Sequence, residues 1–126
     1  MGEQVAAWRV PAVPSAVLEL RRMLLARIAG RGFDTDAVAL AVTEAVTNVV
    51  RHAYSAPGGM VMLRAEASAD ELVVVVADEG IGSRGHIARR NPGMGVGLAL
   101  IRELCTSVRI EPTTTGTTVT MRFAKP

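Results

Sequence analysis

The chain has 126 residues, which is enough for one domain with a buried core and too few for a second core. Hydrophobic residues make up 49% of it and aromatic residues only 3%, so aliphatic side chains must build that core. The formal net charge is +2, and the 13 arginines are scattered, which does not indicate direct nucleic-acid binding. No window approaches the roughly 18 apolar residues of a membrane span, and the start lacks the order of a signal peptide. We expect a single cytoplasmic domain over residues 1–126 with no membrane association.

The first strand and the first helix are separated by prolines. Residues 4–10 alternate as in a short strand, which Pro11 and Pro14 end. Apolar residues then recur with helical spacing over residues 17–28, and Ser15 is in position to cap that helix.

A second helix carries two polar residues in a run of Ala and Val. It is capped by Asp34 or Thr35 and runs to about Tyr54. Glu44 and Asn48 are four residues apart, so they lie on one face about a turn apart. Burying a carboxylate is costly unless it is paired, so this face is either open to water or borders a site.

The second half of the chain alternates strands with one helix. A hairpin turn at Ala69 and Asp70 joins two strand-like runs, and the later pair of strands surrounds Gly116. The expected elements are strands at 58–68, 71–80, 107–113 and 116–124, with a helix at about 96–105. We therefore predict an α/β sandwich of two layers, with a mixed, mostly antiparallel sheet of about five strands covered on one face by three helices.

Two glycine clusters flank the run that follows the buried strand. The segment GIGSRG formally matches the dinucleotide fingerprint, but it does not open a helix, and the acid about 20 residues on, Glu103, lies within a helix. A P-loop motif is also absent. The sequence therefore argues against a dinucleotide site and excludes a P-loop.

Asp78 and the glycines after it are suited to bind a purine. A carboxylate at the end of a strand can accept a hydrogen bond from an exocyclic amine, and Gly80 and Gly82 would let a ring lie against the backbone. Gly93, Gly95 and Gly97 then lead into a helix, whose free N–H groups and positive dipole end favour phosphates. Three arginines between the clusters offer cations for the same phosphates: Arg84, Arg89 and Arg90.

The polar pair on the second helix completes this set. An amide oxygen such as that of Asn48 is a suitable ligand for the Mg²⁺ that accompanies a triphosphate. A carboxylate one turn away, Glu44, can take the proton of a nucleophile. His52 is expected to be a helix-end histidine with an ordinary hydrogen bond, although it is also placed to border the phosphates. Cys105 is the sole cysteine, and we interpret it as a small core residue.

In order and spacing these motifs resemble the GHKL ATPase superfamily, which includes gyrase B, the large heat-shock chaperones, histidine kinases and MutL. Residues 44–48 are similar to its N box, and residues 78–82 to its D-x-G-x-G box. Residues 93–98 and 116–119 are similar to its second glycine box and its last motif. Within the superfamily, the stretch TEAVTNVVRHAY is most similar to bacterial anti-sigma factor serine kinases.

The resemblance implies ATP and Mg²⁺ as cofactors, with a role for each motif. Asn48 would bind Mg²⁺, Glu44 would be the base, and Asp78 would recognise adenine with Thr118 nearby. The nucleotide-binding residues would also include Gly80, Gly82, Arg84, Gly93, Met94, Gly95, Val96, Gly97 and Leu98.

The resemblance further implies a protein serine/threonine kinase that acts as an anti-sigma factor. Its substrate would be a STAS-type anti-anti-sigma protein, a sigma factor would be the alternative partner, and the kinase would form a homodimer. Two other interpretations remain open. One is a non-catalytic, nucleotide-gated binding module of the same fold, against which the intact Glu44 argues. The other is the detached catalytic domain of a histidine kinase, although no phosphoacceptor helix pair precedes the motifs in this chain.

Overall fold

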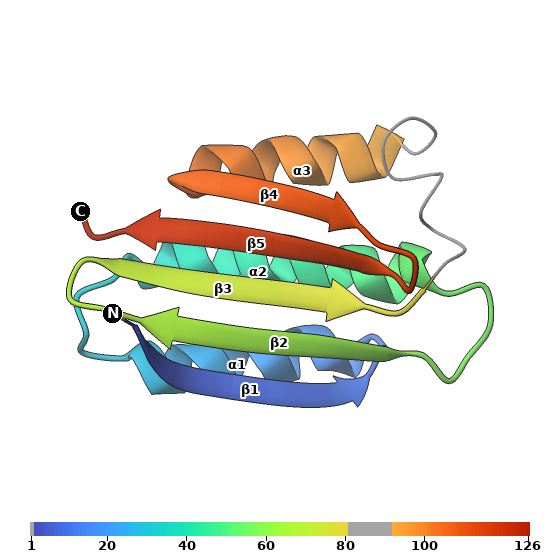
Figure 1. The fold of residues 1–126 in the computed structure, drawn as a ribbon, viewed down its shortest axis with the longest axis horizontal. Helices are drawn as coiled ribbons and strands as arrows, with labels where there is room; N and C mark the ends of the chain where they lie inside the picture. The colour runs from blue at the N-terminus through green and yellow to red at the C-terminus, as the bar shows by residue number, and fades with distance from the viewer. Residues whose placement is uncertain (1, 81–91) are drawn as a thin grey trace.

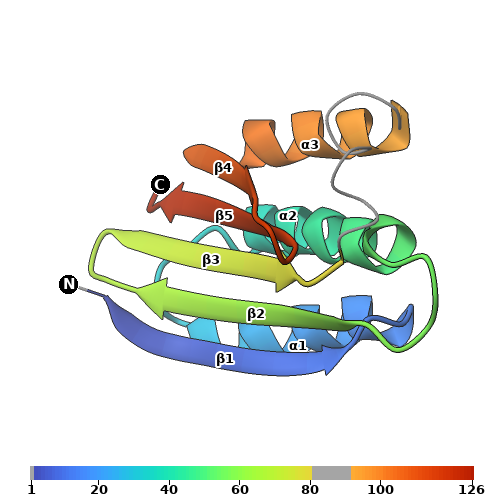
Figure 2. The same ribbon diagram turned by 45° about the vertical axis from the view of Figure 1, so that its right-hand side comes forward.

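A computed structural model describes residues 2–80 and 92–126 of the chain. Its strands and helices follow the predicted order of strand, two helices, two strands, helix and two strands. Figure 1 shows one sheet with the helices on one side of it, and Figure 2 shows the two layers from a turned viewpoint. The predicted two-layer α/β sandwich is therefore confirmed.

The described strands form one five-stranded sheet in the order β1-β2-β3-β5-β4. Every neighbouring pair in it is antiparallel, so the sheet is antiparallel throughout rather than mixed. The short connections at residues 68–70 and 113–116 permit only antiparallel pairing of β2 with β3 and of β4 with β5. The strands are β1 (Glu3–Pro11), β2 (Met60–Ala67), β3 (Glu71–Asp78), β4 (Ser107–Pro112) and β5 (Thr117–Ala124).

The helices cover one face of this sheet because each has one apolar stripe. They are α1 (Ser15–Ile28), α2 (Thr35–Asn48) and α3 (Pro92–Leu104), and α2 packs between the other two. Buried residues of α2 recur every three or four positions, as a sheet-facing stripe requires: Val38, Ala41, Val42, Ala45 and Val46. Along β3 the buried side chains alternate instead. The aliphatic core predicted from composition therefore lies between the two layers.

The two N-terminal helices begin differently. Asp34 caps α2, because its carboxylate accepts a hydrogen bond from the Ala37 N–H at 3.1 Å. Ser15, the expected cap of α1, makes no capping hydrogen bond; Pro14 takes the cap position and Ser15 is the first helical residue. A proline immediately before a helix has the φ angle that the first turn needs, so a hydroxyl cap is dispensable there.

The helical segment bearing Glu44 and Asn48 ends next to Tyr54, as predicted, but its last turn is not α-helical. The α-helix ends at Asn48, and residues 49–53 form a π-helical turn, η1 (Val49–Ala53), before the chain becomes extended at Tyr54. Such a turn accommodates one extra residue by bonding i to i+5, and it commonly occurs at functional sites. Here the wider turn keeps both Val49 and Ala53 buried.

The third helix begins earlier than predicted, at Pro92 instead of about Val96. Proline is favoured in the first turn of a helix, where its missing N–H costs nothing. Cys105 follows the helix directly and is buried. Burial raises the pKa of its thiol to about 11, which agrees with a packing role. In the described part of the chain, no helix has the length and apolarity needed to cross a membrane.

Candidate functional site

A small cavity of about 30 Å³ lies where η1 and the end of α2 meet α3 and the ends of β3 and β5. This volume suits a small polar group rather than a whole ligand, so the cavity is the deep end of any larger site. Its described lining combines an apolar floor with three polar side chains and one imidazole: Ala45, Asn48, Val49, His52, Ala53, Asp78, Leu98, Ile101, Ile110, Thr117 and Val119.

The α2–η1 segment supplies Asn48 and His52 to this cavity, since four residues along a helix return to one face. Glu44, one turn before Asn48, is half-buried and is not among the described lining residues. Of the predicted polar pair, Asn48 therefore lies in the cavity wall, and Glu44 lies on the surface beside it. Because Glu44 stays in contact with water, its carboxylate needs no buried partner.

The imidazole of His52 lines the cavity beside Asn48. It lies in the last turn of the helical segment, as expected, and the sequence also placed it to border the phosphates. Burial, and secondarily the positive charge of Arg51, lower the pKa of His52. This lowered pKa favours the neutral form of the ring at pH 7.

Asp78 ends β3 with its side chain on the covered face of the sheet. It is only 8% exposed, and its Oδ1 accepts a hydrogen bond from the Gly80 N–H at 2.9 Å. Burial raises the pKa of this carboxyl group, against the opposing effect of hydrogen bonds from the backbone N–H groups of Gly80 and Thr117. Burial removes most of the water from this carboxylate. A ligand that donates a hydrogen bond to it would replace that water.

Two glycines allow the backbone around Asp78 to pack closely. A side chain at Gly80 would overlap the carbonyl group of Ala53, and one at Gly116 would overlap the carbonyl group of Asp78. The Asp78 turn is thus held between η1 and the end of the β4–β5 hairpin. Gly80 is therefore required for close packing against Ala53, and its expected contact with a nucleotide ring stays a prediction.

Thr117 is the second polar group at the deep end of the cavity. It pairs with Asp78 across the β3–β5 ladder and is 3% exposed. Its Oγ1 is buried and has no hydrogen-bond partner among the described residues. Thr118, the residue predicted to assist Asp78, is not part of the described lining. Successive residues of a strand point to opposite faces, so only one of the two threonines can face the cavity.

The second glycine box begins the third helix. Leu98 from this box lines the cavity. Gly93, Met94, Gly95, Val96 and Gly97 occupy the first two turns of α3. Gly82 and Arg84, with Arg89 and Arg90, lie outside the described residues.

Comparison with known proteins identifies the architecture around this cavity. Residues 9–123 match the histidine kinase-like ATPase domain. The chain belongs to the histidine kinase-like ATPase family. It is 34% identical to the serine-protein kinase RsbW of Bacillus subtilis over 131 aligned positions, which cover 90% of this chain and 81% of that protein. It is also 47% identical to the anti-sigma F factor of Clostridium acetobutylicum over 49 residues, 39% of this chain and 34% of that protein.

Solved structures share the fold of this histidine kinase-like ATPase. The RsbU and RsbW domains of a Mycobacterium tuberculosis protein superpose with a TM-score of 0.71 at 24% identity, over 98% of this chain and 33% of that one. The histidine kinase domain of the blue-light activated kinase from Erythrobacter litoralis gives a TM-score of 0.55 at 29% identity, over 73% of this chain and 44% of that one. This chain thus spans about one third of the solved mycobacterial protein.

The two threonines at the start of β5 give a prediction that separates their roles. Replacing Thr117 with Val should weaken ATP binding several-fold, about the value of one neutral hydrogen bond, without destabilising the free protein. The second effect is expected because the hydroxyl group is buried without a described partner, and valine removes its desolvation cost. Titration with ATP and urea unfolding of the free protein measure the two effects. Thr118→Val is the comparison, and a larger loss of ATP affinity in that variant would reassign the role.

Proposed function

We propose that this chain is an ATP-dependent protein serine/threonine kinase and anti-sigma factor. Its substrate would be a serine or threonine of a STAS-type anti-anti-sigma protein, and a sigma factor would bind as the alternative partner. The observation that carries the proposal is that the buried Asp78 carboxylate lines one cavity with Asn48 and with the Thr117 hydroxyl group, which has no hydrogen-bond partner among the described residues. The similarity to a protein named as a serine-protein kinase over 90% of the chain supports it.

The residues that line this small cavity suit the polar edge of a purine, and the rest of a nucleotide would lie outside it. Asp78 can accept a hydrogen bond from an exocyclic amine. The Thr117 hydroxyl group, which has no partner in the part of the chain that the structure describes, can bond a ring nitrogen or a bridging water. Leu98, Ile101 and Val119 provide apolar surface for the ring. The N-terminal turn of α3, rich in glycine, would meet the phosphates with free N–H groups.

Asn48 fits the role of a ligand to a Mg²⁺ ion that arrives with the nucleotide. Among the described residues, no group of three or more His, Cys, Asp or Glu side chains could hold a metal by itself. Magnesium bound with ATP needs only one or two protein oxygens beside phosphates and water, and Asn48 supplies an amide oxygen. When bound, the ion would neutralise charge on the phosphates, and Glu44 would accept the proton of the attacking hydroxyl group.

The decisive experiment is transfer of label from γ-labelled ATP to candidate STAS proteins in the presence of Mg²⁺. Labelled STAS protein together with ADP is the expected result. ATP binding without transfer to any candidate would favour a nucleotide-gated binding module, and the position of Glu44 outside the described cavity lining is the observation that favours this alternative. Absence of ATP binding would refute both functions. We propose that the kinase acts as a cytoplasmic homodimer, which sedimentation in solution checks.

The role proposed for Asn48 makes ATP affinity depend on magnesium. Wild-type protein should bind ATP more tightly with Mg²⁺ than with EDTA, whereas Asn48→Ala should lose this difference. The alanine variant removes the amide oxygen that would ligate the ion. Calorimetric titration under both conditions measures the difference, and Thr47→Ala, at a neighbouring position of α2 outside the described lining, is the control. An unchanged magnesium effect in Asn48→Ala would refute the assignment.

A further inference from the structure

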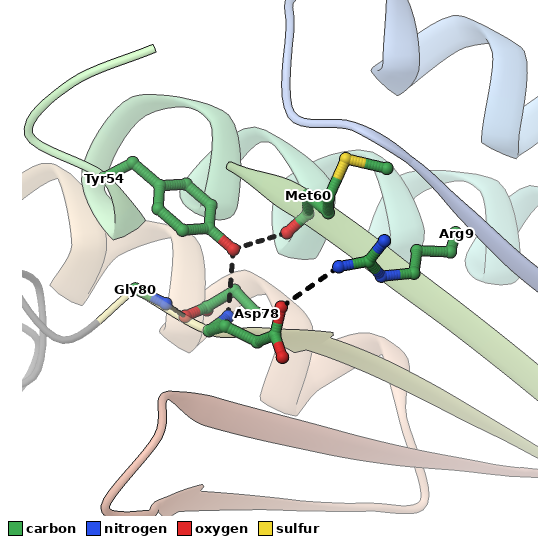
Figure 3. A network of polar contacts seen from close by, with 6 residues as sticks. Arg9, Tyr54, Met60, Asp78 and Gly80 are labelled. Carbon is green, nitrogen blue, oxygen red and sulfur yellow. Dashed lines mark hydrogen bonds and ion pairs between the residues drawn. The ribbon is translucent and has the colours of Figure 1, made fainter. Parts of the chain in front are cut away.

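Tyr54 joins three segments of the chain through its hydroxyl group. The hydroxyl donates to the Met60 carbonyl oxygen at 2.5 Å and accepts from the Glu79 N–H at 2.9 Å. Figure 3 shows the ring reaching from the end of η1 to the first residue of β2 and to the turn after β3. One side chain therefore connects the segment after Asn48 with the segment after Asp78.

The ring of Tyr54 fills a space that its neighbours leave open. It packs against the hydrophobic core, and a side chain at Gly59 would overlap the ring. The absence of a Cβ at Gly59 leaves the space that the phenol fills, just before β2 begins. The packing of the ring and the two hydrogen bonds of its hydroxyl group together hold that hydroxyl group in one position relative to β2 and β3.

A second contact reinforces the same connection. The carbonyl of Ala53, the residue before Tyr54, lies against the Cα of Gly80, where no side chain would fit. Residues 53 and 54 thus hold residues 79 and 80 at two successive points. The Gly80 N–H in turn donates to the Asp78 carboxylate, so the connection extends to the polar group in the cavity.

The other interaction drawn in this network contributes little. Arg9 and Glu79 form an ion pair at 3.3 Å, but their side chains are 57% and 56% exposed. Exposed pairs of this kind are weak and are screened by salt. Of the two described polar contacts between Glu79 and other segments, the hydrogen bond from its backbone N–H to the Tyr54 hydroxyl group is therefore the stronger.

We propose that Tyr54 is a positioning residue for nucleotide recognition. Its hydroxyl group sets the position of Asp78 on β3 relative to Asn48 on α2, and both side chains line the cavity that one nucleotide would have to contact. Because both side chains are already in place in the free protein, less conformational entropy is lost when the ligand binds. This inference rests on the proposed nucleotide site and adds a residue that touches neither ligand nor metal.

The test is the Tyr54→Phe variant, which keeps the aromatic ring in the same space and removes only the hydroxyl group. ATP affinity should fall roughly 5- to 20-fold, since the Glu79 N–H loses its partner. The ratio of ATP affinity to GTP affinity should also decrease, because a displaced Asp78 would no longer accept a hydrogen bond from the exocyclic amine of adenine. In the free protein, amide hydrogen exchange at Glu79 should accelerate. A residue that only stabilised the fold would lower the unfolding midpoint and leave the base preference unchanged.

Two matched variants control for general effects. Arg9→Gln removes the exposed ion pair of the same network. Ser68→Ala removes another hydroxyl group that bonds a backbone turn, at the opposite end of β3. Both should retain wild-type ATP affinity and base preference. If wild-type protein binds ATP and Tyr54→Phe matches it in affinity and base preference, this inference alone is overturned. If wild-type protein binds no ATP, the proposed function fails and this inference fails with it.

Discussion

Glu44→Gln should reduce phosphoryl transfer to a STAS protein by about 10²- to 10⁴-fold, the usual contribution of a positioned general base. ATP affinity should remain at the wild-type level, because Glu44 is not among the described residues that line the cavity. Glutamine has nearly the same shape and cannot take a proton from the attacking hydroxyl. The variant therefore separates transfer from binding. Initial rates of label transfer at saturating ATP, together with ATP titration, measure the two effects.

Glu66→Gln is the matched control for this prediction. Glu66 is exposed on β2, facing away from the helices, so its loss should change neither transfer nor binding. Transfer by Glu44→Gln at the wild-type rate would show that another group takes the proton, and His52 would then be the next candidate, because its neutral imidazole lines the cavity. A loss of ATP affinity in Glu44→Gln would instead mean that Glu44 belongs to the binding site.

Asp78→Asn should weaken ATP binding roughly 10- to 150-fold, the range expected for a hydrogen bond to a charged group. The amide can still accept from the Gly80 N–H, so the turn after β3 should keep its shape. What it loses is the second carboxylate oxygen that can accept from the exocyclic amine of adenine, in place of which it presents a donor. Calorimetric titration with ATP and GTP measures the loss of affinity and the expected fall in base preference.

The same substitution should leave the free protein at least as stable as the wild type at pH 7. Burial raises the pKa of Asp78 in the folded chain above its value in the unfolded chain. The folded state therefore binds the proton more tightly, and wild-type stability decreases as pH rises from about 4 through the folded pKa. Asparagine does not titrate, so this part of the pH dependence should disappear.

Urea unfolding at pH 4 and pH 7 tests this sign, with Asp70→Asn as the control. Asp70 lies in the exposed turn between β2 and β3, where a carboxylate keeps its water. A marked loss of stability in Asp78→Asn at pH 7 would show that the ionised carboxylate supports the fold. Unchanged ATP affinity would remove Asp78 from the proposed adenine site.

The order of elements and the positions of most motifs could be predicted from the sequence because both depend on local patterns. The three- and four-residue spacing of apolar side chains in α2 and the alternation in β3 each report a buried face without knowledge of the partner element. Asp78 was found for the same reason, since it directly follows a run of valines and is followed by glycines. The boundaries of α2 and α3 were less accurate, because the π turn at Val49–Ala53 and the start at Pro92 depend on what each helix packs against.

By itself, the sequence determined the family, the two-layer fold and the residues that form its polar motifs, because residue types and their spacing along the chain are enough to predict these features. Only the tertiary structure decided which of them meet. The β3–β5 register places Thr117 opposite Asp78, and a shift of one residue would have turned Thr118 inward instead. The link from Tyr54 to Glu79 joins residues 25 positions apart, so no local pattern contains it. Contacts of this kind arise when separate elements pack together, and for that reason they had to be seen in three dimensions.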